Sequence, residues 1–141
     1  MKKVILFVVI LVCSEISVAQ CDKTSVLSSS QTEYLDSNHT VQRTVDEKSV
    51  IEITKSEVII THGNDQQKMI GTIKSDSCTW KNPFKEGKSI IKATFTRDDE
   101  KPMNATITIE GKEEKVIFFV EIKEMPDKKI RVIADKFEEK I

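Results

Sequence analysis

A repeated, short alternation of apolar and polar residues constrains the fold of this chain more than any other feature. From Thr40 onward, segments rich in Ile, Val, Thr and Phe recur about every ten to fifteen residues, separated by clusters of Gly, Pro, Asp, Asn and Lys. The clearest segment is 103–110, where Ala105, Ile107 and Ile109 alternate with polar residues. Successive side chains of a strand point to opposite faces. The pattern therefore predicts antiparallel strands with one buried and one wet face.

The remaining segments complete a predicted set of about eight strands. No helical window is longer than residues 135–140, and no βαβ pattern occurs, so a parallel sheet is not expected. A meander of this length removes its edges by closing on itself or by packing as two sheets. We expect an all-β, antiparallel up-and-down meander closed into a barrel, with a two-sheet β-sandwich as the alternative. The other predicted strands are 50–53, 57–61, 68–74, 78–80, 89–96, 116–122 and 130–134, with a weaker one at 40–45.

Two glycines and the two ends of the chain carry further expectations about local structure. Gly71 lies inside a predicted strand and indicates a bulge or a close approach of another group. Gly111 lies in a tight connection at 110–113, where a positive φ is expected. Residues 20–39 are polar and serine-rich, which favours an irregular N-terminal arm with room for one short strand or helical turn. The barrel domain is then expected to cover residues 40–141.

The N-terminus has the features of a cleaved signal peptide. Lys2 and Lys3 precede an apolar run at residues 4–13, which is shorter than the roughly 20 residues that span a bilayer. Ser17 and Ala19 place small side chains at the two positions that a signal peptidase inspects. We expect residues 1–19 to be removed by cleavage after Ala19.

Charge and composition exclude several partners. Removal of residues 1–19 leaves 20 basic and 22 acidic residues, a net charge of about −2. This balance gives no basic footprint for nucleic acid and no polybasic membrane patch. Only Arg43, Arg97 and Arg131 are arginines, so this surface is not expected to be specialised for bidentate recognition of phosphate or carboxylate. We expect no nucleic-acid partner, no membrane span and a monomer.

No catalytic or cofactor motif occurs in the chain. It lacks GxSxG, SxxK, HExxH, P-loop and dinucleotide-binding patterns, and it holds only four glycines. Its two histidines, His39 and His62, do not have the spacing of a metal-ligand pair and are expected in surface loops. We therefore expect a protein that is not an enzyme, with no catalytic residue, no metal and no cofactor.

The order of hairpins, IEITKSEVIITHG, MIGTIKSDSCTW and GKSIIKATFTRDDEKPMNATITIEGKEEKVIFFVEI, resembles the small lipocalin-like proteins exported by Gram-negative bacteria. The resemblance covers residues 40–135 and rests on strand cadence and turn chemistry. It implies a β-barrel that binds a small apolar ligand. It also implies that many such proteins have no assigned activity.

The aromatic and aliphatic residues are compatible with two alternative functions. An eight-stranded barrel is just wide enough to be filled by side chains or to hold one small ligand. In the first function a small hydrophobic ligand enters near Trp80 and Phe84 and contacts Phe95 and Phe118. In the second, Ile117 and Phe119 make the outer face of a strand apolar, and a solid-core protein acts there as an interaction or inhibitory module. That outer face must be covered by the N-terminal arm, a partner or a ligand.

Cys21 and Cys78 are the cysteines that remain after signal cleavage. In an oxidising compartment they are expected to form a disulfide. The bond closes a loop of roughly 58 residues and stabilises the fold by about 4 kcal/mol in the chain-entropy model. The alternative is lipidation of Cys21, although Gln20 is not the small residue that such signals place before the cysteine. We expect a soluble exported protein, periplasmic or secreted, with a lipid anchor at Cys21 as the alternative.

Overall fold

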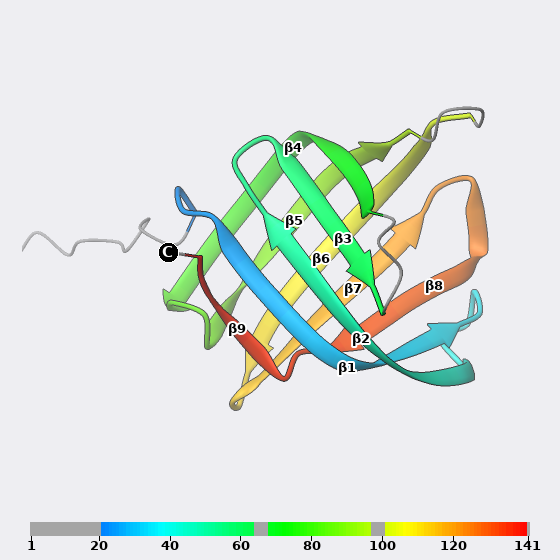
Figure 1. Cartoon of the computed structure of the whole chain (residues 1–141), viewed down its shortest axis with the longest axis horizontal. Coiled ribbons are helices and arrows are strands. Elements are labelled where there is room, and N and C mark those ends of the chain that lie inside the picture. Colours follow the sequence, from blue (N-terminus) through cyan, green and yellow to red (C-terminus); the bar gives the residue numbers. More distant parts are fainter. Residues whose placement is uncertain (1–20, 64–67, 97–100, 141) are drawn as a thin grey trace, which may run out of the picture.

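The computed structural model describes residues 21–63, 68–96 and 101–140, and the predicted signal peptide lies outside these ranges. The described chain is all-β, with nine strands and no helix, so it contains no helix long and apolar enough to cross a membrane. Figure 1 shows the strands wound into a barrel. The strands are β1 (Ser25–Leu35), β2 (Val41–Ile53), β3 (Glu57–His62), β4 (Lys68–Asn82), β5 (Glu86–Phe95), β6 (Met103–Lys112), β7 (Lys115–Ile122), β8 (Met125–Ile133) and β9 (Lys136–Glu139).

The topology is an antiparallel meander that closes on itself. Each strand from β1 to β8 pairs with the next, and residues 32–35 of β1 pair with 129–132 of β8. The N-terminal half of β1 takes a different partner, because residues 25–28 pair with β9. Closure removes the exposed edges that an open eight-stranded sheet would present. The predicted up-and-down barrel is confirmed, with one strand added to it.

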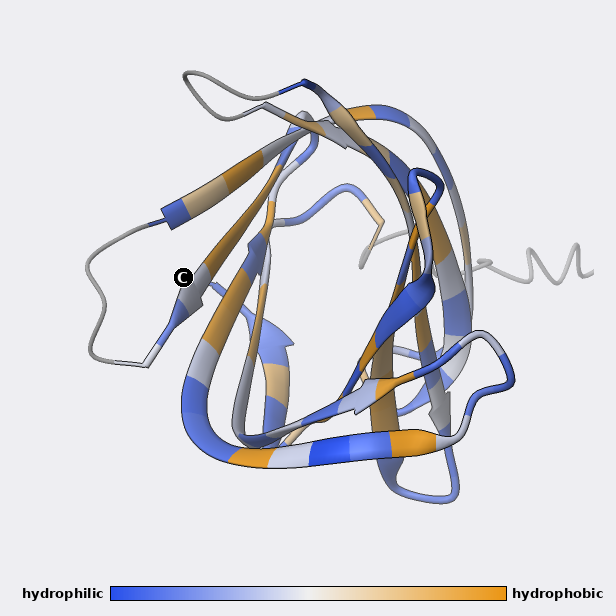
Figure 2. Cartoon of the chain, turned by 90° about the vertical axis from the view of Figure 1, so that its right-hand side faces the viewer, coloured by the Kyte–Doolittle hydropathy of each residue, from blue (hydrophilic) through white to orange (hydrophobic). Residues whose placement is uncertain are grey.

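Alternating residues of the strands fill the interior. On β6 and β7 the inward residues are those that the alternation predicts, including Ala105, Ile107 and Phe118, each at most 4% exposed. Viewed toward one end, the strands form a ring, and apolar and polar residues alternate along individual strands (Figure 2). The other buried apolar side chains are Leu27, Leu35, Ile51, Val58, Ile60, Trp80, Ile91, Ala93, Phe95, Ile109, Val116, Val120 and Val132.

The prediction of an irregular arm at residues 20–39 is wrong for residues 25–35, which form β1. Its inward positions include serines that the barrel keeps buried, and Ser29 is 4% exposed. Ser29 Oγ donates to the carbonyl oxygens of Gln31 at 2.9 Å and Ile133 at 2.8 Å. These bonds satisfy a hydroxyl that would otherwise be costly to bury. Hydrogen bonding to β2, β8 and β9 stabilises this strand. The amino-acid composition of residues 25–35 does not indicate these pairings.

Three further local expectations are corrected. Residues 136–139 form strand β9, not a helical turn, because they pair with β1. The two strands expected at 68–74 and 78–80 are one long strand, β4, with a register shift between Ile73 and Ser75. The positive φ expected near Gly111 belongs to Glu113 and Glu114, at 52° and 65°, which form the β6–β7 turn.

Both glycines in the strands mark close approaches. A Cβ at Gly71 would lie 2.7 Å from the Phe95 ring, so the glycine gives that ring its place in the interior. A Cβ at Gly111 would lie 2.5 Å from the Lys85 carbonyl oxygen and 2.8 Å from the Trp80 indole. The β4–β5 turn therefore packs directly on the backbone of β6.

Candidate functional site

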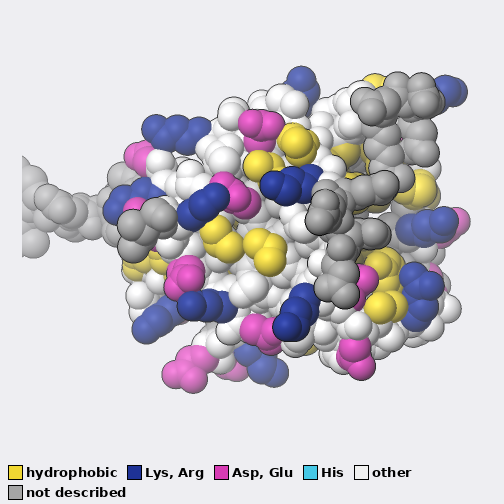
Figure 3. All heavy atoms as spheres, viewed as in Figure 1, with side chains coloured by type: hydrophobic (Ala, Val, Ile, Leu, Met, Phe, Trp, Pro, Cys, Tyr) yellow, Lys and Arg dark blue, Asp and Glu magenta, His cyan; other side chains and the backbone are white. Residues whose placement is uncertain are grey.

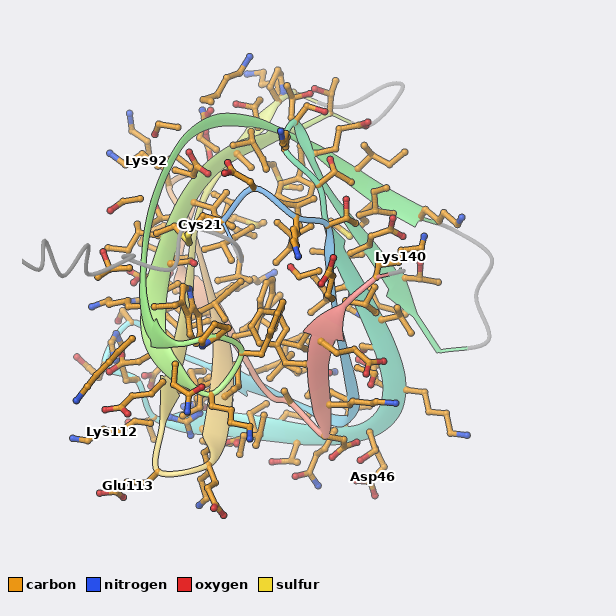
Figure 4. The ribbon with its side chains drawn as sticks, turned by 90° about the vertical axis from the view of Figure 1, so that its left-hand side faces the viewer. Cys21, Asp46, Lys92, Lys112, Glu113 and Lys140 are labelled. Atoms are coloured by element: carbon orange, nitrogen blue, oxygen red, sulfur yellow. A yellow bond between two sulfur atoms is a disulfide. The ribbon has the colours of Figure 1, made fainter. Side chains whose placement is uncertain are left out.

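One end of the barrel is closed by a disulfide and by aromatic side chains, and we call it the tethered end. Cys21 and Cys78 are bonded, with 6.0 Å between their Cα atoms, which confirms the predicted disulfide. In Figure 4, which views this end, Cys21 lies within the ring of strands, whereas Lys92, Lys112 and Glu113 point outward. The bond agrees with an oxidising compartment.

Trp80 and Phe84 lie at the tethered end. Both rings pack against Phe137 of β9, with centroids 5.8 and 5.0 Å away. Trp80 Nε1 donates to Ser89 Oγ at 2.8 Å, and Ser89 Oγ lies 3.4 Å from Cys78 Sγ. A space of only about 40 Å³ remains beside the disulfide. These residues close the tethered end of the barrel, where a ligand is expected to enter from the positions of Trp80 and Phe84 in the sequence.

Phe95 and Phe118 lie apart from that cluster and line a small apolar cavity toward the opposite end. The cavity has a volume of about 50 Å³. Pockets for small molecules usually measure roughly 300–1,000 Å³. The four aromatic residues predicted to bind a ligand are thus split into two pairs, and the space between the strands is filled by side chains. The cavity lining also includes Ser49, Ile51, Ile60, His62, Met69, Met103, Ala105, Val120, Ile122, Ile130 and Val132.

The opposite end, which we call the mouth, carries a polar wall on β1, β2 and β3. Tyr34 pairs with Ile130 on one side and with Arg43 on the other. Directly paired residues of antiparallel strands share a face. Because Ile130 lines the interior cavity, Tyr34 and Arg43 face the interior as well.

The side chains of this polar wall contact one another. The Arg43 guanidinium lies 4.5 Å from the centroid of the Tyr34 ring, and the Tyr34 hydroxyl donates to Glu47 Oε1 at 3.3 Å. His62 Nδ1 lies 3.7 Å from Glu47 Oε1 and 3.3 Å from Ser49 Oγ. Burial and then the Glu47 carboxylate raise the pKa of Tyr34 above its usual value, while Arg43 opposes them. Tyr34 is therefore neutral at physiological pH.

Ser49, His62 and Glu47 do not form a catalytic triad. Ser49 and Glu47 both approach the same ring nitrogen of His62, whereas a triad uses one nitrogen for the nucleophile and the other for the orienting carboxylate. Ser49 is also only 1% exposed. Among the described residues no group of three His, Cys, Asp or Glu side chains could hold a metal ion.

A larger hollow, which we call the vestibule, lies at the mouth. Its volume is about 580 Å³, and it shares Ile122 and Ile130 with the interior cavity. Aliphatic side chains from β7 and β8 form its floor, and charged side chains lie around it. The vestibule is lined by Tyr34, Leu35, Gln42, Arg43, Ile122, Met125, Asp127, Lys128, Lys129 and Ile130.

The predicted interaction face lies in a separate groove on the outside of the barrel. Ile117 and Phe119 are half-buried there, in a hollow of about 430 Å³. The β1–β2 turn forms part of its wall, since the His39 ring lies 5.4 Å from the Phe119 ring. His39 Nε2 also lies 2.9 Å from Lys129 Nζ. The rest of the lining is Thr108, Glu110, Lys112, Glu113, Lys115 and Arg131.

The face formed by β1 to β4 is less hollowed. Figure 3 shows its apolar side chains in small clusters among lysines and carboxylates. Val50 and Ile70, which are 44% and 47% exposed, are among the exposed apolar residues of β2 and β4. Scattered apolar residues of this kind are usual on protein surfaces.

Sequence reasoning does not identify the polar residues of the mouth as a site. His62, expected in a surface loop, is half-buried at the end of β3 and lines the cavity. Tyr34 lies in the segment expected to be irregular. The usable signal is the spacing of Val45, Glu47, Ser49 and Ile51, which places two polar residues on a face that continues into the core.

Comparison of the chain with protein-family models, with curated proteins and with solved structures gave no match.

Proposed function

We propose that this protein is an exported, non-enzymatic β-barrel that binds a small apolar ligand in the vestibule at its mouth. The observation that carries the proposal is the vestibule itself, a hollow at the mouth whose floor is formed by apolar side chains of the barrel interior. The hollow of about 580 Å³ has the size of a small-molecule pocket. Its floor residues Ile122 and Ile130 also line the apolar cavity beneath it.

The polar wall supports this function. Ligand sites combine an apolar lining with a small number of placed polar groups. At the mouth these groups are Tyr34, Arg43 and Glu47, which contact one another and are thereby held in place. A titratable group whose pKa is shifted by burial and by a specific charge, as that of Tyr34 is, also favours a functional site.

Export is supported by two features of the chain. The first is the apolar N-terminal segment that follows Lys2 and Lys3. The second is the disulfide between Cys21 and Cys78, because such bonds persist in oxidising compartments. The resemblance to exported lipocalin-like proteins agrees with both.

Binding of the neutral probe N-phenyl-1-naphthylamine tests the proposal. The probe should fluoresce on addition to the protein, and Ile122→Gln should weaken its affinity roughly tenfold, because the substitution removes a partly buried apolar side chain from the floor. Ile133→Gln is the matched control, since Ile133 is 42% exposed and does not line the vestibule. Equal losses in the two variants, or no binding to the wild type, would refute the proposal.

The outer groove supports a second function, recognition of a protein partner. Ile117 and Phe119 form an apolar floor, and Arg131, which is paired with Glu33 at 2.8 Å, adds a fixed charge beside it. Quantitative crosslinking in the native cell would test this function. A crosslinked partner should be lost in Phe119→Gln and retained in Ile90→Gln, which changes an exposed apolar residue of β5.

A further inference from the structure

The vestibule is locally cationic in a chain that is acidic overall. Arg43, Lys128 and Lys129 line it, whereas Asp127 is the one carboxylate in its lining. The whole chain has a net charge of −1. A hollow with low-dielectric walls and one dominant sign of charge concentrates ligands of the opposite sign. The positive charge of the lining therefore favours a ligand that carries a negative charge.

Arg43 is the cation best placed to meet a ligand. Its guanidinium forms no ion pair with a carboxylate among the described residues, and it lies 4.5 Å from the centroid of the Tyr34 ring. Tyr34 does not compete as an anion, because its hydroxyl is protonated and donates to Glu47. Arg43 also interacts with the Tyr34 hydroxyl, but a guanidinium has five N–H donors, so others remain for a ligand at the edge of the hollow.

The two lysines stand on β8, which is separated from Arg43 on β2 by the strand β1. Lys129 is held in place, since its ammonium lies 3.5 Å from Glu121 Oε2 and 2.9 Å from His39 Nε2. Lys128 is exposed and forms no ion pair among the described residues. One lysine is thus partly neutralised and structural, and the other is open to solvent and to a ligand.

We propose that the ligand of the vestibule is an amphipathic carboxylate. This inference rests on the proposed function, because it names the chemistry of the ligand held at the same mouth. The carboxylate accepts hydrogen bonds from the Arg43 guanidinium, whose planar fork matches its two oxygens, and Lys128 adds a second positive charge. The apolar part of the ligand lies on Ile122, Met125 and Ile130, since the cavity of about 50 Å³ below the floor is too small to admit it.

Competition among three amphiphiles with the same carbon chain tests this inference. Decanoate, 1-decanol and decylamine are each titrated against bound N-phenyl-1-naphthylamine, below their aggregation concentrations. Decanoate should displace the probe at a concentration roughly tenfold or more below that of decanol, because charge-assisted hydrogen bonds are the stronger ones. Decylamine should compete least of the three.

Variants of Arg43 test whether its guanidinium causes the preference for decanoate over decanol. Arg43→Gln should reduce the decanoate preference roughly tenfold while the affinity for the neutral probe changes little. Arg43→Lys keeps the charge but not the planar fork, so it should keep only part of the preference, and Lys92→Gln, on the outer face of β5, should keep all of it. Thermal unfolding of each variant checks that the fold is retained.

The possible failures are distinguishable. If the probe binds but decanoate and decanol compete equally, or Arg43→Gln leaves their ratio unchanged, the carboxylate inference is wrong and the proposed binding function stands. If neither the probe nor any of the three amphiphiles binds, the proposed function and the inference are both overturned.

Discussion

Replacement of Thr32 by valine should stabilise the protein. Thr32 lies on β1 with none of its surface exposed, and its Oγ1 has no hydrogen-bond partner among the described residues. Leaving a buried hydroxyl unpaired costs about 1–3 kcal/mol. Valine has the same shape, exchanges the hydroxyl for a methyl group and is at least as favourable in a strand. We expect the free energy of unfolding to rise by about 1–2 kcal/mol.

Equilibrium unfolding in urea measures the effect. The chain has a single tryptophan, Trp80, which is 4% exposed, so its fluorescence reports the loss of the core. The midpoint should move to higher urea concentration with the slope of the transition unchanged. In a thermal scan, a gain of this size raises Tm by about 3–8 °C for a domain of this length.

Two matched variants separate the hydroxyl from other effects of the substitution. Thr44→Val changes an exposed threonine of β2 and should alter the free energy of unfolding by less than about 0.5 kcal/mol. Thr32→Ser keeps the hydroxyl and removes a buried methyl group, so it should destabilise by about 1 kcal/mol. Destabilisation by Thr32→Val would show that the hydroxyl has a partner in solution and would refute the reasoning.

Three other predictions concern the tethered end and the mouth. The double variant Cys21→Ser/Cys78→Ser should lose about 4 kcal/mol in urea unfolding, since the bond joins residues 57 apart; a loss below about 1 kcal/mol would contradict it. Gly111→Ala should destabilise by about 1–3 kcal/mol, because its Cβ would lie 2.5 Å from the Lys85 carbonyl oxygen; a neutral effect would place that turn elsewhere. Tyr34, the only tyrosine, should titrate above its usual value of 10.0 when phenolate absorbance is followed at alkaline pH. Because its folded pKa is raised, stability should fall as the pH rises past the unfolded value, and Tyr34→Phe should reduce that fall.

The barrel and its disulfide were accessible to sequence reasoning because both follow from strong local signals. The alternation of Ala105, Ile107 and Ile109 with polar residues specifies one buried face, and many short strands without helices favour a closed antiparallel meander. Only two cysteines lie outside the predicted signal peptide, so only one pairing is available. In both cases the signal can be read directly from the order of residue types along the chain.

The first and last strands were not accessible for the opposite reason. β1 contains Ser25, Ser28, Ser29 and Ser30, and its stability comes from three partner strands, of which β8 and β9 are remote in sequence. β9 pairs with only four residues of β1. Strand propensity depends on the neighbouring strands more than on the segment itself, so neither segment has a clear pattern of its own.

The position of the proposed site follows from how the two ends of the barrel differ. At the tethered end, Cys21, Trp80 and Phe137 fill the opening, and Gly111 lets the β4–β5 turn pack against β6. At the mouth, β2 extends beyond its pairing with β3, which begins at Ser49. The inward residues of that extension face a hollow and not a packed core, so they can be polar. Aromatic content alone pointed to the closed end, whereas a charged residue such as Arg43 is tolerated on an inward face only where the barrel is open to water.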